Sequence, residues 1–540
     1  MLERCLMTIP KNSSRGMYFV VGSGPAGIAC AQALIAEGAS VTILDAGLTL
    51  EPEREAIRAA MASRNKVDWT DTERTAFAAV AATNGMVPMK LTYGSDYPYR
   101  LSSGSTPLTP SEPCLRGSYA QGGLSNVWGG AILPYRDQDI AGWPVSSQEM
   151  ALAYREIMKT LPLTARYDEL ATTWPLYTDR YSALTCSSQA KLLLQSLEAN
   201  RTKLYNQNIR FGGSRLAVAA LAASNGHPCN LCGECLNGCP RDLIYTARHA
   251  LERLMGNGAI GYISGVTVKR VEETSDGVRI FAVDKQGERC FIGARVFIAA
   301  GVLNTTEIML RSFDLQQIEI KDSQYFIFPL FLWRGAKNVV TERLHTLAQL
   351  FIEIDDSDIS QYGVHLQVYS YNDFISATLK QKLGWLYRFF PKKWFLNHMM
   401  VVQGYLHSAD SGTIEVRLDS NNSGDLLVVN PIPKIESRDK VLRVLRKIKK
   451  MARLMRALPM GALLQMTDPG RGFHAGGSFP MAVTPKQGQT DKLGRPLGMT
   501  RIHLVDASIF PDIAATTITL TVMANAWRIG HYVACMEGQP

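Results

Sequence analysis

Four cysteines stand within eleven residues near the middle of the chain, at Cys229, Cys232, Cys235 and Cys239, and Pro240 follows them. Their spacing, C-x2-C-x2-C-x3-C-P, matches the run that holds iron–sulfur clusters in bacterial ferredoxins. Structural zinc is an alternative, although zinc ribbons usually separate two CxxC pairs by a longer loop. Disulfides are disfavoured, because cysteines so close in sequence would close strained rings. We therefore expect an iron–sulfur cluster, and a vestigial or purely structural cysteine run is the other alternative.

The number of iron atoms stays open at this point. In two-cluster ferredoxins the fourth cysteine of such a run binds the other cluster, and this chain has a single run. Cys239 therefore either completes a [4Fe-4S] cluster or stands aside from a [3Fe-4S] cluster.

The N-terminal part of the chain has the pattern of a dinucleotide-binding unit. An apolar stretch at 18–21 leads into Gly22-Ser-Gly24-Pro-Ala-Gly27, and a helical pattern over 28–37 precedes a second apolar stretch, 41–44, and Asp45. Glycines at these positions let the backbone approach a pyrophosphate at the helix N-terminus, and the acid accepts hydrogen bonds from a ribose. The motif alone does not distinguish NAD from FAD.

Composition limits the class of protein. The 540 residues include 46% hydrophobic and 19% charged residues, which is typical of a globular enzyme large enough for two domains. The net charge of +9 suits an anionic cofactor, an acidic partner or an anionic membrane surface. No nucleic-acid recognition motif is present, and we expect no nucleic-acid partner.

The sequence also suggests a compartment. The first sixteen residues lack the apolar stretch of a secretory signal, and no uninterrupted apolar stretch reaches membrane-spanning length. Segment 516–536 is interrupted by Asn525, Arg528 and His531, so we interpret it as a buried helix. Six scattered cysteines outside the run suit a reducing compartment. A cytoplasmic location is expected, either free or peripheral on the inner face of the membrane.

Several further motifs occur in a fixed order. They are the glycine-rich segment 122–130, Trp143-Pro144-Val-Ser146, the segment 296–305, His474, and the segment 504–511. Together with the first glycine motif they resemble the glucose–methanol–choline (GMC) family of FAD oxidoreductases, from about residue 17 to residue 535. With its cysteine run the chain is similar to a membrane-linked subset of sugar and polyol dehydrogenases in that family.

This resemblance implies an α/β fold. A Rossmann-like FAD-binding domain, with a parallel sheet and helices, is interleaved with a substrate domain built on an antiparallel sheet. The FAD-binding domain would comprise residues 16–140, 215–312 and 470–540, with the cysteine run at 229–239. The substrate domain would comprise 141–214 and 313–469.

The resemblance also assigns residues to FAD. Its binding would involve Gly22, Gly24, Ala26, Gly27, Asp45, Ala46, Gly123, Ser125, Asn126, Gly129, Val266, Ala300, Gly301, Asp506 and Thr517. Some relatives bind FAD covalently through a histidine, and the matching position here is Val127. Valine cannot form that bond, so we expect non-covalent FAD.

His474 matches the catalytic histidine of the family. Oxidation of an alcohol removes a hydroxyl proton, and an imidazole with a pKa near 6.5 suits that step. The family usually has a second His or Asn at the position of Thr517, which can hydrogen-bond a hydroxyl but cannot act as a base. Catalysis would then depend on His474, with Thr517 as its partner.

The predicted function is oxidation of a CH–OH group of a sugar, polyol or related alcohol, with electrons leaving through the cluster to an acceptor protein or a quinone. An oxygen-using alcohol or sterol-type oxidase is one alternative. A flavin and iron–sulfur electron-transfer protein that oxidises no alcohol is another.

The middle of the chain has the alternating pattern of strands. We predict strands over 325–333, 344–354, 363–371, 399–406 and 412–418, in an antiparallel sheet on the substrate side. Segment 379–396 interleaves aromatic residues with Lys and Arg, as in peripheral membrane contacts, although a flap over the active site has the same composition. Segment 440–456 has amphipathic helical spacing.

Overall fold

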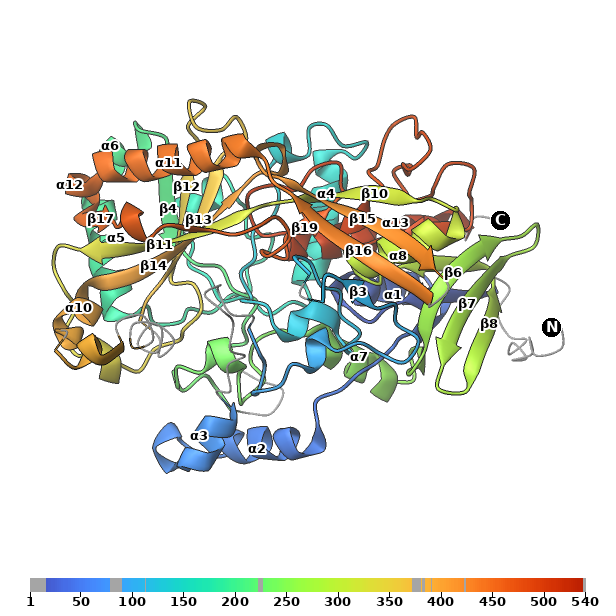
Figure 1. Ribbon diagram of the computed structural model, residues 1–540, viewed down its shortest axis with the longest axis horizontal. Coiled ribbons are helices and arrows are strands. Elements are labelled where there is room, and N and C mark those ends of the chain that lie inside the picture. The colour runs from blue at the N-terminus through green and yellow to red at the C-terminus, as the bar shows by residue number, and fades with distance from the viewer. Residues whose placement is uncertain are drawn as a thin grey trace.

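The computed structural model describes residues 16–77, 90–111, 113–221, 227–371, 380, 384–389, 391–421 and 424–537. The chain forms an elongated molecule in which a parallel sheet with its helices and a larger antiparallel sheet occupy different ends (Figure 1). Both ends of the described chain lie beside the parallel sheet and the small sheet next to it (Figure 1).

The parallel sheet has five strands in the order β20-β9-β1-β2-β5, and every neighbouring pair is parallel. Its strands are β1 (Met17–Val21), β2 (Ser40–Leu44), β5 (Gly261–Ile263), β9 (Arg295–Ile298) and β20 (Ile502–Leu504). The first two strands are almost wholly buried, as expected for a sheet covered on both faces. The predicted Rossmann-like sheet is confirmed.

Helix α1 (Pro25–Ala36) follows β1 directly, as the glycine motif predicts. Gly24 is its N-cap and Pro25 occupies the first turn, where a missing N–H costs nothing. The small residues of α1 are buried against α13 (Thr519–Glu537). Within α13, buried Arg528 donates hydrogen bonds to Asn525 Oδ1 and to the backbone carbonyl of Lys492, so part of its guanidinium is satisfied inside the core. No helix in the described ranges has the length and apolarity to cross a membrane.

The large antiparallel sheet has the order β17-β11-β14-β13-β12-β4, and β18 pairs with β11 beside this path. Its strands are β4 (Ile209–Gly213), β11 (Tyr325–Leu332), β12 (Leu350–Ile354), β13 (Val364–Tyr369), β14 (Met399–Leu406), β17 (Ala457–Pro459) and β18 (Gln465–Met466). Four of the five predicted strands are therefore in this sheet. β12 starts six residues later than predicted.

Segment 412–418 is a strand as predicted, but the prediction of the sheet to which it belongs was wrong. This segment lies in β15 (Thr413–Asn421), which belongs to a separate sheet of order β19-β10-β15-β16-β3. The other strands are β3 (Leu108–Thr109), β10 (Gln317–Asp322), β16 (Gly424–Ile432) and β19 (Ala475–Gly476). β15 makes a hairpin with β16, a local pairing whose partner strand we did not predict. A fourth sheet consists of β6 (Thr267–Glu273), β7 (Val278–Asp284) and β8 (Gly287–Gly293).

Helix α4 (Ser147–Met158) begins where the Trp-Pro-Val-Ser segment predicts. Ser146 is its N-cap and forms a reciprocal capping box with Glu149. α4 packs against α13 in the core beneath the parallel sheet, although its sequence lies in the segment assigned to the substrate domain.

The other helices lie around these sheets, and one of them, α8 (Val302–Ser312), is largely buried against β6 and β10 (Figure 1). They are α2 (Pro52–Ala62), α3 (Asp71–Phe77), α5 (Ser188–Ala199), α6 (Arg201–Tyr205), α7 (Ala247–Gly256), α8 (Val302–Ser312), α10 (Lys392–His398), α11 (Ile435–Lys450) and α12 (Ala452–Met455). α11 and α12 together cover the predicted amphipathic segment 440–456, and their apolar face packs on the large sheet.

Candidate functional site

A cavity of about 1130 Å³ lies between the parallel sheet and the large antiparallel sheet. On one side it is lined by residues that follow the carboxyl ends of the parallel strands, including Gly22, Asp45, Ala300 and Asp506. In open α/β sheets this edge is where ligands bind. The opposite wall comes from β11, β13 and β14.

The three motif glycines have separate structural reasons. Gly22 has a φ of +97°, which only glycine adopts freely, and a Cβ on Gly27 would lie 2.0 Å from the carbonyl oxygen of Gly22. A Cβ on Gly24, by contrast, would meet nothing within 4 Å. Gly24 lines the cavity at the N-terminus of α1, so its bare backbone faces open space that a pyrophosphate would fit.

Asp45 lies buried at the end of β2 and accepts hydrogen bonds from Ser23 and, at 3.1 Å, from Tyr262. Burial raises the pKa of Asp45 to about 6, against the lowering effect of these two donors. Val266 donates its backbone N–H to the carbonyl oxygen of Asp45 at 3.0 Å.

The second glycine-rich segment is held next to the first. Gly123 has a φ of +59°, and a Cβ on it would lie 3.4 Å from the Cα of Gly24. Ser125 donates to the carbonyl of Gly122 at 2.6 Å and accepts from the backbone N–H of Ala247 at 2.9 Å. The Asn126 amide donates to the carbonyls of residues 121 and 123, which fixes the turn itself.

Asp506 uses its carboxylate inside the protein. It accepts from the backbone N–H groups of Gly301 and Ser508, each at 2.9 Å, and from the hydroxyl of Thr305 at 2.5 Å. These bonds fasten the turn after β9 to the turn after β20 at the edge of the cavity.

The predicted cofactor residues divide into two groups. Those that line the cavity are Gly22, Gly24, Ala26, Asp45, Gly123, Ser125, Gly129, Ala300, Gly301, Asp506 and Thr517. Gly27, Ala46, Asn126 and Val266 are not in its lining and support the neighbouring backbone.

His474 lines the same cavity, and its ring stacks on that of Tyr405 with centroids 4.5 Å apart. The preceding residue, Phe473, has a φ of +55°, which turns the loop sharply at this point. Burial, with a smaller contribution from the nearby His365, lowers the pKa of His474 to about 3. The imidazole is therefore neutral at physiological pH, and burial makes it a weaker base than an exposed histidine.

Thr517 also lines the cavity and is buried. Its hydroxyl oxygen accepts the backbone N–H of Leu133 at 2.7 Å. That bond leaves the hydroxyl proton available for donation, so Thr517 is placed to orient a ligand.

Several polar residues of the cavity were not predicted. The wall of the cavity includes Gln367 and Tyr369 of β13 and Gln403 and Tyr405 of β14. The residues of each pair are two positions apart and therefore lie on the same face of their strand. The period-two pattern of these strands was visible in the sequence, but it did not tell which face meets the cavity. Arg471, three residues before His474, is another lining residue that we did not predict.

The four cysteines line a second, much smaller cavity together with Trp69, Leu231 and Leu243. In the described part of the chain, no three of the four sulfur atoms lie within 4.8 Å of one another. A single tetrahedral zinc would bring its sulfur ligands to about 3.8 Å. A cubane cluster holds its cysteines farther apart, because each sulfur binds a different iron at a different corner.

The two cavities share the cysteine loop as a wall. Gly233, Leu236 and Asn237 line the large cavity, whereas Cys232 and Cys235 beside them line the small one. Burial raises the pKa of the Cys232 thiol to about 12, and the neighbouring cysteines add to the effect. Thiolates are thus strongly disfavoured here unless a cation binds them.

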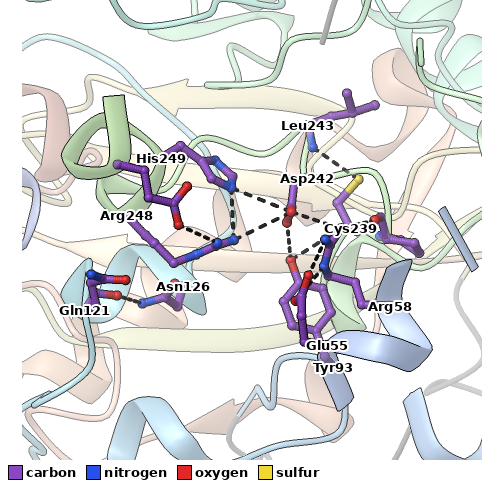
Figure 2. Close-up of polar contacts among 12 residues, drawn as sticks. Glu55, Arg58, Tyr93, Gln121, Asn126, Cys239, Asp242, Leu243, Arg248 and His249 are labelled. Carbon is purple, nitrogen blue, oxygen red and sulfur yellow. Dashed lines mark hydrogen bonds and ion pairs between the residues drawn. The ribbon is translucent and has the colours of Figure 1, made fainter. Parts of the chain in front are cut away.

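Asp242 anchors the end of the cysteine loop, as Figure 2 shows. Its carboxylate accepts from the Tyr93 hydroxyl at 2.7 Å and pairs with Arg58 at 2.9 Å. Arg248 and His249 of α7 approach it at 3.6 and 3.7 Å. Burial alone would raise the pKa of Asp242, but His249 and the two arginines lower it to about 2.

The parallel sheet, its glycine turns and the cavity at its carboxyl edge are arranged as in dinucleotide-binding folds. Residues 411–526 match the family model described as GMC oxidoreductase. Three similar solved structures cover nearly the whole chain. Pyridoxine 4-oxidase from Mesorbium loti is 13% identical with a TM-score of 0.57, covering 95% of this chain and 98% of that one. A formate oxidase is 13% identical with a TM-score of 0.61, covering 98% of this chain and all of that one.

The third structure is a variant of the formate oxidase of Aspergillus oryzae RIB40, studied for its effect on FAD modification. It is 13% identical with a TM-score of 0.59, over 98% of this chain and 100% of that one. No curated protein matches the chain. The resemblance to the GMC oxidoreductases and the predicted α/β fold class are both confirmed.

Proposed function

We propose that this protein is an FAD-dependent oxidoreductase that acts on a CH–OH group of a sugar, polyol or related small alcohol. One observation carries the proposal: a single cavity joins the dinucleotide-type glycine turns to His474. The cavity is large enough for a dinucleotide and a small ligand together.

FAD, when bound, would supply a two-electron acceptor next to His474. The glycine turn at the start of α1 would hold its pyrophosphate, and Asp45 would accept a ribose hydroxyl. Val127 lines the cavity and cannot form a covalent link, so the bound FAD would be dissociable.

The neutral imidazole of His474 would accept the hydroxyl proton of the substrate. Its stacking on Tyr405 fixes the plane of the ring, and a fixed orientation favours proton transfer. Thr517 would donate a hydrogen bond to the substrate oxygen, since its own oxygen already binds Leu133.

We also propose that Cys229, Cys232, Cys235 and Cys239 hold an iron–sulfur cluster. Support comes from the small cavity that the four cysteines share and from their ferredoxin spacing. Such a cluster, when bound, would accept electrons one at a time for an acceptor protein or a quinone. Because the cysteine loop borders the large cavity, the two cofactors would be neighbours.

A second candidate is an oxidase in which oxygen takes the electrons. The names of the similar structures favour it, since pyridoxine 4-oxidase and formate oxidase are both called oxidases. We prefer the dehydrogenase because the four cysteines offer the electrons another route. A cytoplasmic location is part of the same proposal, since a cluster on cysteine thiolates suits a reducing compartment.

The test is anaerobic purification followed by visible and EPR spectra, with iron and sulfide analysis. We expect flavin bands together with about four irons per chain. Flavin bands without iron would remove the cluster and leave the FAD proposal standing, whereas a colourless protein would overturn both. Anaerobic mixing with a panel of sugars and polyols should then bleach the flavin. Rapid peroxide formation in air would favour the oxidase, and a flavin bleached by no alcohol would favour a pure electron-transfer role.

A further inference from the structure

An aromatic surface lies at the end of the large sheet, and it consists of Trp333, Trp385, Phe389 and Trp394. These four side chains are 53%, 76%, 73% and 55% exposed. Large aromatic side chains are seldom exposed side by side in a protein that only meets water. The lower left of Figure 1 shows this region around α10.

Contacts within each half of this surface hold its aromatic side chains, and only four residues of chain separate Phe389 from Trp394. The rings of Trp385 and Phe389 lie 6.3 Å apart. Trp394, on α10, packs on Phe331 at 5.4 Å, and Trp333 stands two positions after Phe331, just beyond the end of β11. The backbone N–H of Ala336 binds the carbonyl of Asn397 at 2.9 Å, which fastens the loop after β11 to α10.

The surface is also strongly cationic. In the described parts of segments 333–341 and 380–398, the charged residues are Arg334, Lys337, Lys380, Arg388, Lys392 and Lys393, and none of them is acidic. Among these, Arg388, Lys392 and Lys393 lie exposed beside the aromatic rings. Aromatic rings with lysines around them match the boundary between lipid headgroups and acyl chains, and the positive charge matches anionic lipids.

We propose that this aromatic surface docks the protein on an anionic lipid bilayer. Trp385 and Phe389 would enter the headgroup region, and the lysines would contact lipid phosphates. A second copy of the chain fits less well, because two such cationic surfaces would repel one another. An acidic protein would complement the positive charge of this surface, but its binding would not require three exposed tryptophans.

The aromatic surface lies far enough from the cavity that docking on a bilayer would not block the cavity. β11 and β14 run from Tyr325 and Tyr405, which line the cavity, to Leu332 and Met399, which border the aromatic surface. Eight residues of strand span about 25 Å. The cavity would thus stand above the bilayer, with its residues unaffected by changes at the aromatic surface.

The test is co-sedimentation of the full protein with phosphatidylcholine vesicles, with and without phosphatidylglycerol. We expect binding that requires phosphatidylglycerol and weakens with salt, and a blue shift of tryptophan fluorescence on binding. Trp385→Ala combined with Phe389→Ala should reduce vesicle binding at least tenfold. The matched control combines Val67→Ala with Tyr167→Ala, since these exposed side chains lie elsewhere. It should bind as the unchanged protein does.

Three results would overturn the proposal. The first is absence of vesicle binding by the unchanged protein, and the second is equal binding by the aromatic variant and the control. The third is a concentration-dependent dimer in light scattering that the aromatic variant abolishes, because the surface would then join two copies of the chain. Circular dichroism of the variant shows whether it folds. If it does not, Lys392→Glu with Lys393→Glu replaces it, and loss of the salt-dependent binding is expected.

Discussion

Arg58 on α2 and Asp242 at the end of the cysteine loop form an ion pair of 2.9 Å. Arg58 also donates to the carbonyl of Pro240 at 2.6 Å, so it holds the loop by both a side chain and the backbone. Asp242 has a φ of +51°, a strained region for most side chains that Asp and Asn tolerate. The loop that carries Cys239 therefore depends on partners far away in sequence.

Asp242→Asn should weaken the cysteine loop. Asparagine keeps the backbone preference and removes the charge, leaving Arg58 and Arg248 without their shared partner. We expect a loss of about 2 kcal/mol in unfolding free energy, since the site is largely but not fully buried. Iron should also be lost faster to a chelator. Glu252→Gln is the control, because Glu252 pairs with Arg248 on the surface, and it should cost less than about 0.5 kcal/mol. Equal losses in both variants would contradict the anchoring role.

The glycines of the first motif offer a matched pair of changes. Gly24→Ala adds a Cβ that meets no protein atom, so the protein should fold with a nearly unchanged melting temperature. The methyl group would intrude where the pyrophosphate lies, and FAD affinity should fall roughly tenfold or more. Gly27→Ala places its Cβ 2.0 Å from the Gly22 carbonyl oxygen, and this overpacking should destabilise the fold by about 1–3 kcal/mol. Flavin content and thermal unfolding measure both effects. Normal flavin binding by Gly24→Ala would place the pyrophosphate elsewhere.

The βαβ unit could be predicted because its signals are local. The glycines, Pro25 and Asp45 lie within thirty residues, and each has a steric or chemical reason visible in the sequence. The cysteine run was equally visible. The pairing of β15 with β16 and β10 was not, because strand partners depend on long-range packing that residue alternation does not encode.

The same dependence on long-range packing explains why several cavity residues were not predicted. Gln367 and Tyr405 alternate with buried apolar residues, as they would in any half-buried strand. Which face of β13 and β14 lines the cavity is determined by how the large sheet packs over the glycine turns. Arg58 and Tyr93 likewise gave no signal, since ordinary surface helices and loops carry such residues.

Cys239 decides the type of cluster. All four cysteines line the same small cavity, so we expect Cys239 to bind iron and the cluster to be [4Fe-4S]. Cys239→Ala should then release one iron and give a [3Fe-4S] cluster with an EPR signal in the oxidised state. Cys290→Ser, on β8, is the control and should leave the iron content unchanged. An unaltered spectrum of Cys239→Ala would show that three cysteines suffice.

His474→Ala should slow anaerobic flavin reduction by roughly 10²–10⁴-fold, because general-base catalysis contributes about that much. Its flavin content should stay normal. The exposed His227→Ala is the control. With the pKa of His474 lowered to about 3, the rate should not fall between pH 8 and pH 5, whereas a base of ordinary pKa near 6.5 would lose roughly 30-fold at pH 5. Stopped-flow reduction at a series of pH values distinguishes these outcomes.

Buried histidines should make the protein less stable in acid. Burial lowers the pKa of His503 to about 3, against 6.5 in the unfolded chain, and the pKa of His345 to about 4. The unfolded chain then binds more protons below pH 6.5, so stability is complete above that pH and falls as pH decreases toward the folded-state values. One such histidine contributes a loss of up to about 2 kcal/mol between pH 7 and pH 5.

His503→Gln tests this linkage at one site. Glutamine can donate to the Leu493 carbonyl, as His503 Nδ1 does at 2.9 Å, but it does not titrate in this range. The variant should lose about 2 kcal/mol less than the unchanged protein between pH 7 and pH 5, whatever its stability at pH 7. Urea unfolding at the two pH values gives the difference. If His503→Gln changed the unfolding free energy by the same amount at pH 7 and at pH 5, burial of His503 would not contribute to the acid sensitivity.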